Sequence, residues 1–309
     1  MKKYIIFTAI STIFLVGCRT SKDVAITSQH EFIQTVLVKQ VEATIDNNII
    51  AAKYENGTTL YYTILDNFGN VSLTWDRSSN RQSYDEGYST YKGDIDIPSF
   101  VMVSGLNEEF IFRVVEIDDY AFYNCTNVTS INIPHSINRI LANALKGCSG
   151  LVKITVNERN AMYKDIDGVL FSKDSRMLVK YPAKKELPGY TISEDVSFIC
   201  QEAFQDNSFL RRITVGNFVT VISDYAFKNC SELRDVTLGR NVRVIGKQSF
   251  FGCLKLETLN SRNVFPPHNS PVVFEESTKE NCRLYVPRGQ MENYKRHLEW
   301  SEFKNVVEY

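Results

Sequence analysis

The chain has 309 residues, of which 43% are apolar, so it can bury a sizeable core and is not globally disordered. Its 35 basic and 36 acidic side chains give a formal net charge of -1, which excludes the basic excess typical of nucleic-acid-binding proteins. The sequence also has no polybasic run that would attach it to an anionic membrane.

Residues 1–17 are typical of a secretory signal peptide. Lys2 and Lys3 precede an apolar run over residues 4–16, which is shorter than the roughly 20 residues that a membrane span needs. The run ends in Leu-Val-Gly-Cys, which resembles a bacterial lipobox and implies cleavage before Cys18 and acylation of that residue. We therefore expect a lipoprotein that is attached to the outer membrane by its lipid anchor alone. The alternative is an ordinary signal peptide with an incidental cysteine.

A polar segment without periodicity follows and predicts a flexible tether. Arg19 stands where aspartate would favour retention in the inner membrane, so the lipobox resemblance favours the outer membrane. Residues 21–23 (SKD) resemble a surface-export signal only weakly, which leaves display on the cell surface open.

The next segment is predicted to form a β-rich N-terminal region. Residues 60–64 and 71–75 alternate around Asn-Phe-Gly-Asn at 67–70, a pattern typical of a β-hairpin. Residues 93–98 (GDIDIP) resemble a degenerate repeat strand, whereas residues 32–45 fit either a strand or a helix.

A unit of about 23 residues recurs between residues 117 and 260. Each unit begins with a small residue followed by a large apolar one, at Ala121, Ala144, Ala203, Ala226 and Ser249. The consensus A-F-x-x-C-x-x-L-x-x-I-x-I contains a short strand with one buried face, and V-x-x-I follows after a turn. One unit cannot bury its apolar residues alone, so five units are predicted to stack into coils with strands about 4.8 Å apart.

Cysteines follow the small residue by four positions, at Cys125, Cys148, Cys230 and Cys253, and Asn207 takes this position in the third unit. Because the position faces the coil interior, we predict free buried thiols that act as small apolar groups. Disulfides between stacked coils are the alternative, although stacking alone does not provide their geometry. No Cys-x-x-Cys motif or Cys/His cluster supports a zinc site.

The repeats are interrupted and then terminated by segments of different pattern. Residues 157–189 separate the second unit from the third and predict a hairpin of two short strands around a polar turn. After the last unit, residues 282–287 (CRLYVP) predict a final strand, and a short helix carrying Tyr294 and Trp300 should follow it.

These motifs resemble the BspA-like leucine-rich repeats of bacterial surface proteins. The resemblance is carried by residues 117–125 (IDDYAFYNC), residues 222–230 (ISDYAFKNC), the D-G-V-L-F-S-K-D stretch and the final C-R-L-Y-V-P-R-G. The predicted fold is a β-rich α/β leucine-rich-repeat solenoid with a β-hairpin cap at its N-terminus and a strand-helix cap at its C-terminus. The chain is predicted to begin with a signal peptide (residues 1–17) and a tether (18–30). An N-terminal β region with its cap (31–110), the repeats (111–260) and a C-terminal cap (261–309) follow. The family implies extracellular binding or adhesion.

Catalytic signatures do not occur in the sequence. It has no G-x-S-x-G, H-E-x-x-H, phosphate-binding or dinucleotide-binding motif, and its four histidines are scattered. We therefore predict a protein that is not an enzyme and uses no metal or cofactor.

The candidate ligand-binding residues are predicted to lie on the surface, most of them on the repeats. Residues at the outward strand positions should form one polar stripe across the repeat sheet, namely Ser130, Asn132, Lys153, Thr155, Arg212, Thr214, Asp235, Thr237 and Thr258. The same residues could reflect β-propensity and cross-strand pairing alone. Tyr84 and Tyr88 in a polar loop are a second candidate, because exposed aromatic residues favour interfaces.

The leading hypothesis is a surface adhesin or protein-binding module whose partner is a host or bacterial surface protein. A glycan-binding accessory of an outer-membrane uptake system is the alternative, in which Tyr84 and Tyr88 would stack on sugar rings. A hydrolase and an envelope spacer without a specific ligand are further possibilities.

Overall fold

The computed structural model describes residues 40–75, 91–104, 109–270 and 272–309, which form two compact units. The first unit holds the described residues up to 91 together with 96–123 and 133–144, and the second holds 92–95, 124–132 and 145–309. The predicted signal peptide and tether lie outside the described residues and stay predictions.

The first unit is built on one mixed sheet. Its strand order is β1 (Gln40–Asp46), β2 (Ile49–Tyr54), β3 (Thr59–Ile64), β4 (Asn70–Thr74), β7 (Glu109–Ile117) and β6 (Phe100–Ser104), with β9 (Arg139–Ile140) also beside β7. β3 and β4 pair antiparallel, which confirms the predicted hairpin, and Gly69 adopts a φ of 81° in its turn. β1 also shows that the described end of the undecided segment is a strand.

A second sheet has three strands in the order β10 (Lys153–Val156), β8 (Val128–Ile133) and β5 (Gly93–Asp96). The pairing of β5 with β8 confirms that this early segment behaves as a repeat strand. The predicted outward exposure of Ser130 is wrong, because its side chain is buried and its Oγ donates a hydrogen bond of 2.6 Å to Oδ1 of Asp94. Asp94 precedes Ser130 by 36 residues, so the repeat period gave no sign of this contact.

The insertion between the second and third units contains three strands. β12 (Val169–Ser172) and β13 (Met177–Lys180) pair antiparallel and confirm the predicted hairpin. β11 (Tyr163–Ile166), which the sequence pattern did not reveal, pairs antiparallel with β12 through a turn in which Asp167 and Gly168 both have positive φ.

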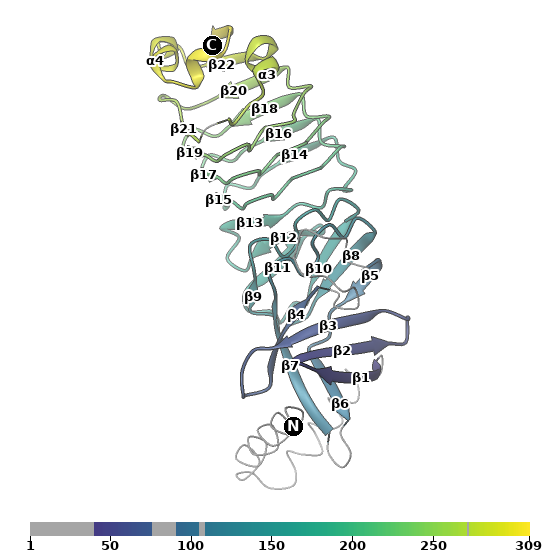
Figure 1. Cartoon of the computed structure of the whole chain (residues 1–309). Helices are drawn as coiled ribbons and strands as arrows, with labels where there is room; N and C mark the ends of the chain where they lie inside the picture. The colour runs from purple at the N-terminus through teal and green to yellow at the C-terminus, as the bar shows by residue number, and fades with distance from the viewer. Residues whose placement is uncertain (1–39, 76–90, 105–108, 271) are drawn as a thin grey trace. The chain divides into compact units, whose positions relative to one another are not determined.

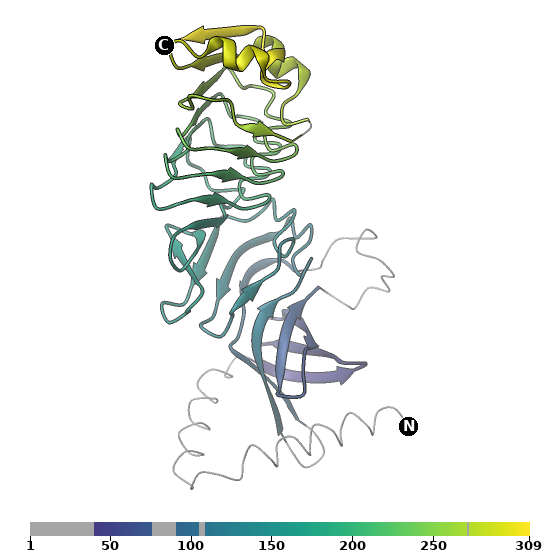
Figure 2. The same cartoon turned by 90° about the vertical axis from the view of Figure 1, so that its left-hand side faces the viewer.

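The repeats form two ladders, shown in Figures 1 and 2, of which sheet D is parallel throughout and sheet C is parallel from β13 onward. Sheet D is β14 (Gly189–Thr191), β16 (Arg212–Thr214), β18 (Asp235–Leu238), β20 (Thr258–Ser261), β22 (Arg283–Val286) and β23 (Asn305–Glu308). Sheet C is β11, β12, β13, β15 (Phe198–Ile199), β17 (Val221–Ile222), β19 (Val244–Ile245) and β21 (His268–Asn269). The register of Arg212 with Asp235 and of Asp235 with Thr258 confirms the predicted coil length. The V-x-x-I segment was predicted to follow a turn but was not assigned to a strand. In the structure it forms the short strands β15, β17 and β19 of sheet C.

Aromatic rings fill the interior between these ladders. Phe204, Phe227, Phe250 and Phe274 are buried and stack in sequence with ring centroids 4.6, 5.0 and 5.5 Å apart. Tyr181 from the insertion extends the stack at 4.8 Å from Phe204, so the insertion shares the core of the coils.

Two further strands extend sheet D beyond the five predicted units at its C-terminal end. β22 pairs Arg283 with Thr258 of β20, and this interval is slightly longer than the repeat, which hid β22 from the repeat pattern. The predicted single helix is divided between α4 (Met291–Arg296) and a 3-10 turn, η1 (Trp300–Glu302), while α3 (Glu276–Asn281) was not predicted. Trp300 is anchored by a 2.9 Å hydrogen bond from Nε1 to the Pro267 carbonyl. Among the described residues, no helix has the length and apolar character to cross a membrane.

Candidate functional site

The residues predicted to form one polar stripe lie in two different sheets. Lys153 and Thr155 belong to β10, whereas Arg212 and the later members belong to sheet D. The insertion packs against β10, where Gly168 accepts a 2.9 Å hydrogen bond from the Ile154 amide. The structure therefore brings together the five candidates from residue 212 onward and leaves Lys153 and Thr155 as a separate patch.

The outer face of sheet D is formed by two columns of side chains in register. The first column is Gly189, Arg212, Asp235, Thr258, Arg283 and Asn305, and the second is Thr191, Thr214, Thr237, Asn260, Tyr285 and Val307. All of these residues are exposed or half-buried, and the residues between the columns point into the core. Such a largely polar array offers hydrogen bonds to a ligand along six neighbouring strands.

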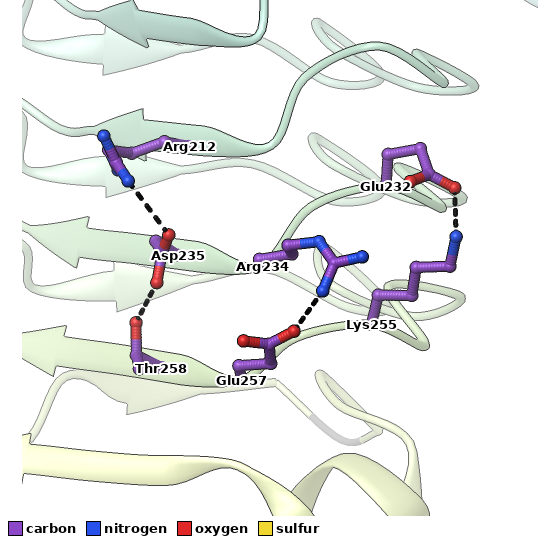
Figure 3. A network of polar contacts seen from close by, with 7 residues as sticks. All are labelled: Arg212, Glu232, Arg234, Asp235, Lys255, Glu257 and Thr258. Atoms are coloured by element: carbon purple, nitrogen blue, oxygen red, sulfur yellow. Dashed lines mark hydrogen bonds and ion pairs between the residues drawn. The ribbon is translucent and has the colours of Figure 1, made fainter.

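Charged residues on this face pair between neighbouring coils (Figure 3). Nη2 of Arg212 lies 3.5 Å from Oδ2 of Asp235, whose other oxygen accepts a 2.6 Å hydrogen bond from Thr258. Arg234 and Glu257, which directly precede β18 and β20, form a second ion pair. Because exposed ion pairs contribute only about 0–1 kcal/mol, this network orders the surface more than it stabilises the fold.

A third pair at the side of the face joins Glu232 to Lys255. The hydrogen bond from Lys255 lowers the pKa of the Glu232 carboxyl below its ordinary value. All three ion pairs join residues 23 positions apart, so the repeat period itself brings opposite charges together.

Seven members of the face were not predicted from the sequence, and they are Gly189, Thr191, Asn260, Arg283, Tyr285, Asn305 and Val307. Arg283 and Tyr285 continue the columns on β22, where Nη1 of Arg283 donates a 3.3 Å hydrogen bond to the Tyr285 hydroxyl. Their signal was the C-R-L-Y-V-P stretch, which was recognised as a strand but not placed in the stack because its interval differs from the repeat.

Lys180 is a buried amine whose charge is satisfied inside the coils. Burial lowers the pKa of Lys180, and its Nζ donates a 2.8 Å hydrogen bond to the Glu202 carbonyl. The Glu202 carboxylate in turn lies 3.5 Å from Nζ of Lys146. These contacts satisfy the buried charges and give them a structural role. Within the described ranges, no cluster of three or more His, Cys, Asp or Glu residues could hold a metal ion.

The repeat cysteines serve the core. Cys230 and Cys253 are buried thiols, and each Sγ donates a 3.2 Å hydrogen bond to a carbonyl of the preceding coil, on Phe204 and Phe227. Asn207 at the same position donates to the Pro182 carbonyl at 3.2 Å, so the position requires a small side chain that can donate a hydrogen bond.

These thiols should be unreactive in the folded protein. Burial raises the pKa of Cys148 and Cys230, and it raises the pKa of the half-buried Cys200 to about 12. Because only the thiolate is nucleophilic, we expect no labelling of the repeat cysteines by Ellman's reagent at pH 8 within minutes, and slow labelling of Cys200. Addition of 6 M guanidinium chloride should expose all of them, whereas fewer labelled thiols without reductant would reveal disulfides.

The remaining predicted residues, Cys18, Tyr84 and Tyr88, lie outside the described residues. Their roles in lipidation and ligand binding therefore stay predictions. Of the four histidines, His30 lies there too, and His135 is engaged in a turn, with Nδ1 3.2 Å from the Ser99 hydroxyl.

Comparison with known proteins places these features in a family. The model of the BspA type leucine rich repeat region matches residues 100–184 and 180–268 with six copies of the repeat. A leucine-rich repeat protein from Eubacterium ventriosum is similar in structure, with a TM-score of 0.55, 19% identity and coverage of 87% of this chain and 85% of that chain. A leucine rich cell surface protein from Faecalibacterium prausnitzii has a TM-score of 0.46 and 16% identity, with coverage of 87% and 95%. A comparison with curated proteins found no match.

Proposed function

The chain belongs to the BspA type leucine-rich repeat family, and from this we propose that it is a cell-envelope lipoprotein that binds a protein partner through the outer face of sheet D. The observation that carries the proposal is the register of this face. Six parallel strands present two columns of polar side chains over a continuous surface. Solenoids of stacked repeats commonly bind macromolecules through such extended arrays.

The composition of the face favours a protein partner over a glycan. Its two columns are dominated by threonine, asparagine and arginine, and Tyr285 is their one aromatic member. A glycan site would need several exposed rings on which sugars can stack, and the other candidates, Tyr84 and Tyr88, lie outside the described residues.

A non-enzymatic role is part of the proposal. Repeat solenoids of this family act as scaffolds, and the shifted pKa of Lys180 is explained by contacts that satisfy a buried charge. Turnover of peptide or glycoside pools by the purified protein would contradict this part.

Replacing both Arg212 and Asp235 with alanine should weaken binding of the partner at least about tenfold, because it removes the central pair of the face while keeping the net charge. Immobilised protein would be tested against host matrix proteins and bacterial surface proteins by surface plasmon resonance. The matched control replaces Asp174 and Arg176, an exposed pair 3.9 Å apart on the insertion turn, and should bind normally. The proposed site would be refuted if both variants lost binding equally, or if the immobilised protein bound glycans and no protein.

The lipid anchor is tested separately. Cys18→Ala should block acylation and move the protein from the membrane pellet to the soluble fraction, because no other attachment is proposed. Labelling with an alkynyl fatty acid should mark the wild type and not the variant. Protease added to intact cells would show whether the anchored protein is displayed outside the cell. An unchanged membrane fraction for Cys18→Ala would refute the anchor.

A further inference from the structure

Three arginines lie just beyond the carboxyl ends of three neighbouring strands of sheet D. Arg240 follows β18, Arg262 follows β20 and Arg288 follows β22, and all three side chains are exposed. The three strands are adjacent and parallel (Figure 1), so the arginines come from consecutive coils whose strands lie about 5 Å apart. We call these three residues the arginine edge.

None of these guanidinium groups forms an ion pair with a carboxylate in the described part of the chain. The nearby carboxylate of Glu308 accepts a 2.9 Å hydrogen bond from the Met291 amide. This and other backbone hydrogen bonds are the main cause of the lowered pKa of Glu308, to which the charge of Arg288 adds less. Glu194 stands at the far end of the same side of the sheet and uses both oxygens to accept hydrogen bonds from Asn217.

Charges are arranged differently on the outer face of sheet D. There, a charge on one coil meets the opposite charge on the next, as with Arg212 and Asp235 or Arg234 and Glu257. At the arginine edge, like charges lie on three consecutive coils. Continuing the strand register, Arg240 and Arg288 take equivalent positions two coils apart, and Arg262 lies one position earlier on the coil between them. Repeated positive charge of this kind attracts a partner with repeated negative charge.

Exposed apolar side chains accompany the arginines. Phe218, Val264 and Phe265 lie in the turns after β16 and β20, with 61%, 52% and 70% of their surfaces exposed. Phe265 stands one repeat length beyond Val242, which is buried in the preceding coil, so the repeat position that normally faces the core is here turned to solvent. Val264 and Phe265, which are neighbours in the chain, expose apolar surface of the kind that marks protein interaction sites.

We propose that the arginine edge is a second docking site, separate from the outer face of sheet D, and that it binds an acidic protein segment. Carboxylates of the segment would pair with Arg240, Arg262 and Arg288, since guanidinium groups bind carboxylates in two-point geometry. Apolar side chains of the same segment would pack on Phe265 and Phe218. This mixture of charge and apolar surface favours a polypeptide over an acidic polysaccharide, which would use the arginines alone.

The test uses the protein without its signal peptide and a fluorescent twelve-residue peptide of glutamate interspersed with leucine. Fluorescence anisotropy should show binding that weakens with salt and is lost, by at least about tenfold in affinity, in the triple variant Arg240→Gln, Arg262→Gln and Arg288→Gln. The matched control changes Arg159, Arg176 and Arg211 to glutamine, which removes the same charge from exposed sites elsewhere and should leave binding unchanged. Phe265→Ser should lower the affinity for the peptide severalfold without changing the salt dependence of binding.

Other outcomes would overturn the proposal. The first is that the wild type does not bind the peptide, and the second is that the triple variant and its control lose equal affinity. The third is that the protein binds heparin and also binds a peptide with serine in place of leucine as tightly as the original peptide. Thermal unfolding of the triple variant should be unchanged or shifted upward, because it relieves repulsion between like charges, and a large drop would instead assign the arginines a structural role. The outer-face variant of Arg212 and Asp235 should bind the acidic peptide normally, so failure of one site leaves the other testable.

Discussion

Replacing Phe227 with alanine should lower the free energy of unfolding by about 3–5 kcal/mol. Phe227 is fully buried and lies between Phe204 and Phe250, with ring centroids 4.6 and 5.0 Å away and nearly parallel planes. Removal of the ring would leave a cavity in the middle of the stack, and the rigid coils on either side cannot collapse into it. Equilibrium unfolding in urea, followed by circular dichroism, measures the loss.

Two further substitutions make this prediction specific. Phe218→Ala removes a ring that is mostly exposed and should change stability by less than about 0.5 kcal/mol. Phe227→Leu should give an intermediate loss, because Leu145 naturally occupies the corresponding position of the second unit. Equal effects of Phe227→Ala and Phe218→Ala would show that the aromatic stack does not hold the coils together.

Gly239→Ala should lower the free energy of unfolding by about 3 kcal/mol. A Cβ at this position would lie 2.8 Å from the Gly216 carbonyl carbon and 2.9 Å from Cα of Asn217, both in the preceding coil. Because these are backbone atoms of a hydrogen-bonded ladder, they cannot move aside without separating two coils. The measurement is again the free energy of unfolding, supported by hydrogen exchange of the amides in β16 and β18.

Gly189→Ala provides the control for this effect. A Cβ there would have the Arg212 carbonyl oxygen as its nearest neighbour at 4.0 Å, which is ordinary contact. We expect a change within about 0.5 kcal/mol, or a small gain from reduced freedom of the unfolded chain. A Gly239→Ala protein as stable as Gly189→Ala would mean that the coils are less tightly stacked than the structure shows.

Much of the solenoid follows from a local pattern that is repeated at a fixed interval. Ala203 and Ala226 are buried, and Arg212, Asp235 and Thr258 are in register, as the repeat spacing predicts. The period is informative because each coil packs mainly on its neighbours, so equivalent residues repeat the same contacts.

Elements that depart from the period were missed or misplaced. The helix α3, the division of Tyr294 and Trp300 between two elements, and β11 carry no repeat signal. β22 was recognised as a strand, but its longer interval from β20 concealed that it continues sheet D.

The sequence by itself therefore determined the coil, namely its length and its inward residues. Only the tertiary structure decided which surfaces exist. Ser130 is buried and bonded to Asp94, and Lys153 and Arg212 lie in different sheets. Arg240, Arg262 and Arg288 lie along one edge of sheet D. The physical reason is that inward packing is set by spacing within one unit, whereas an exposed surface depends on segments joined at irregular intervals, which no periodic pattern encodes.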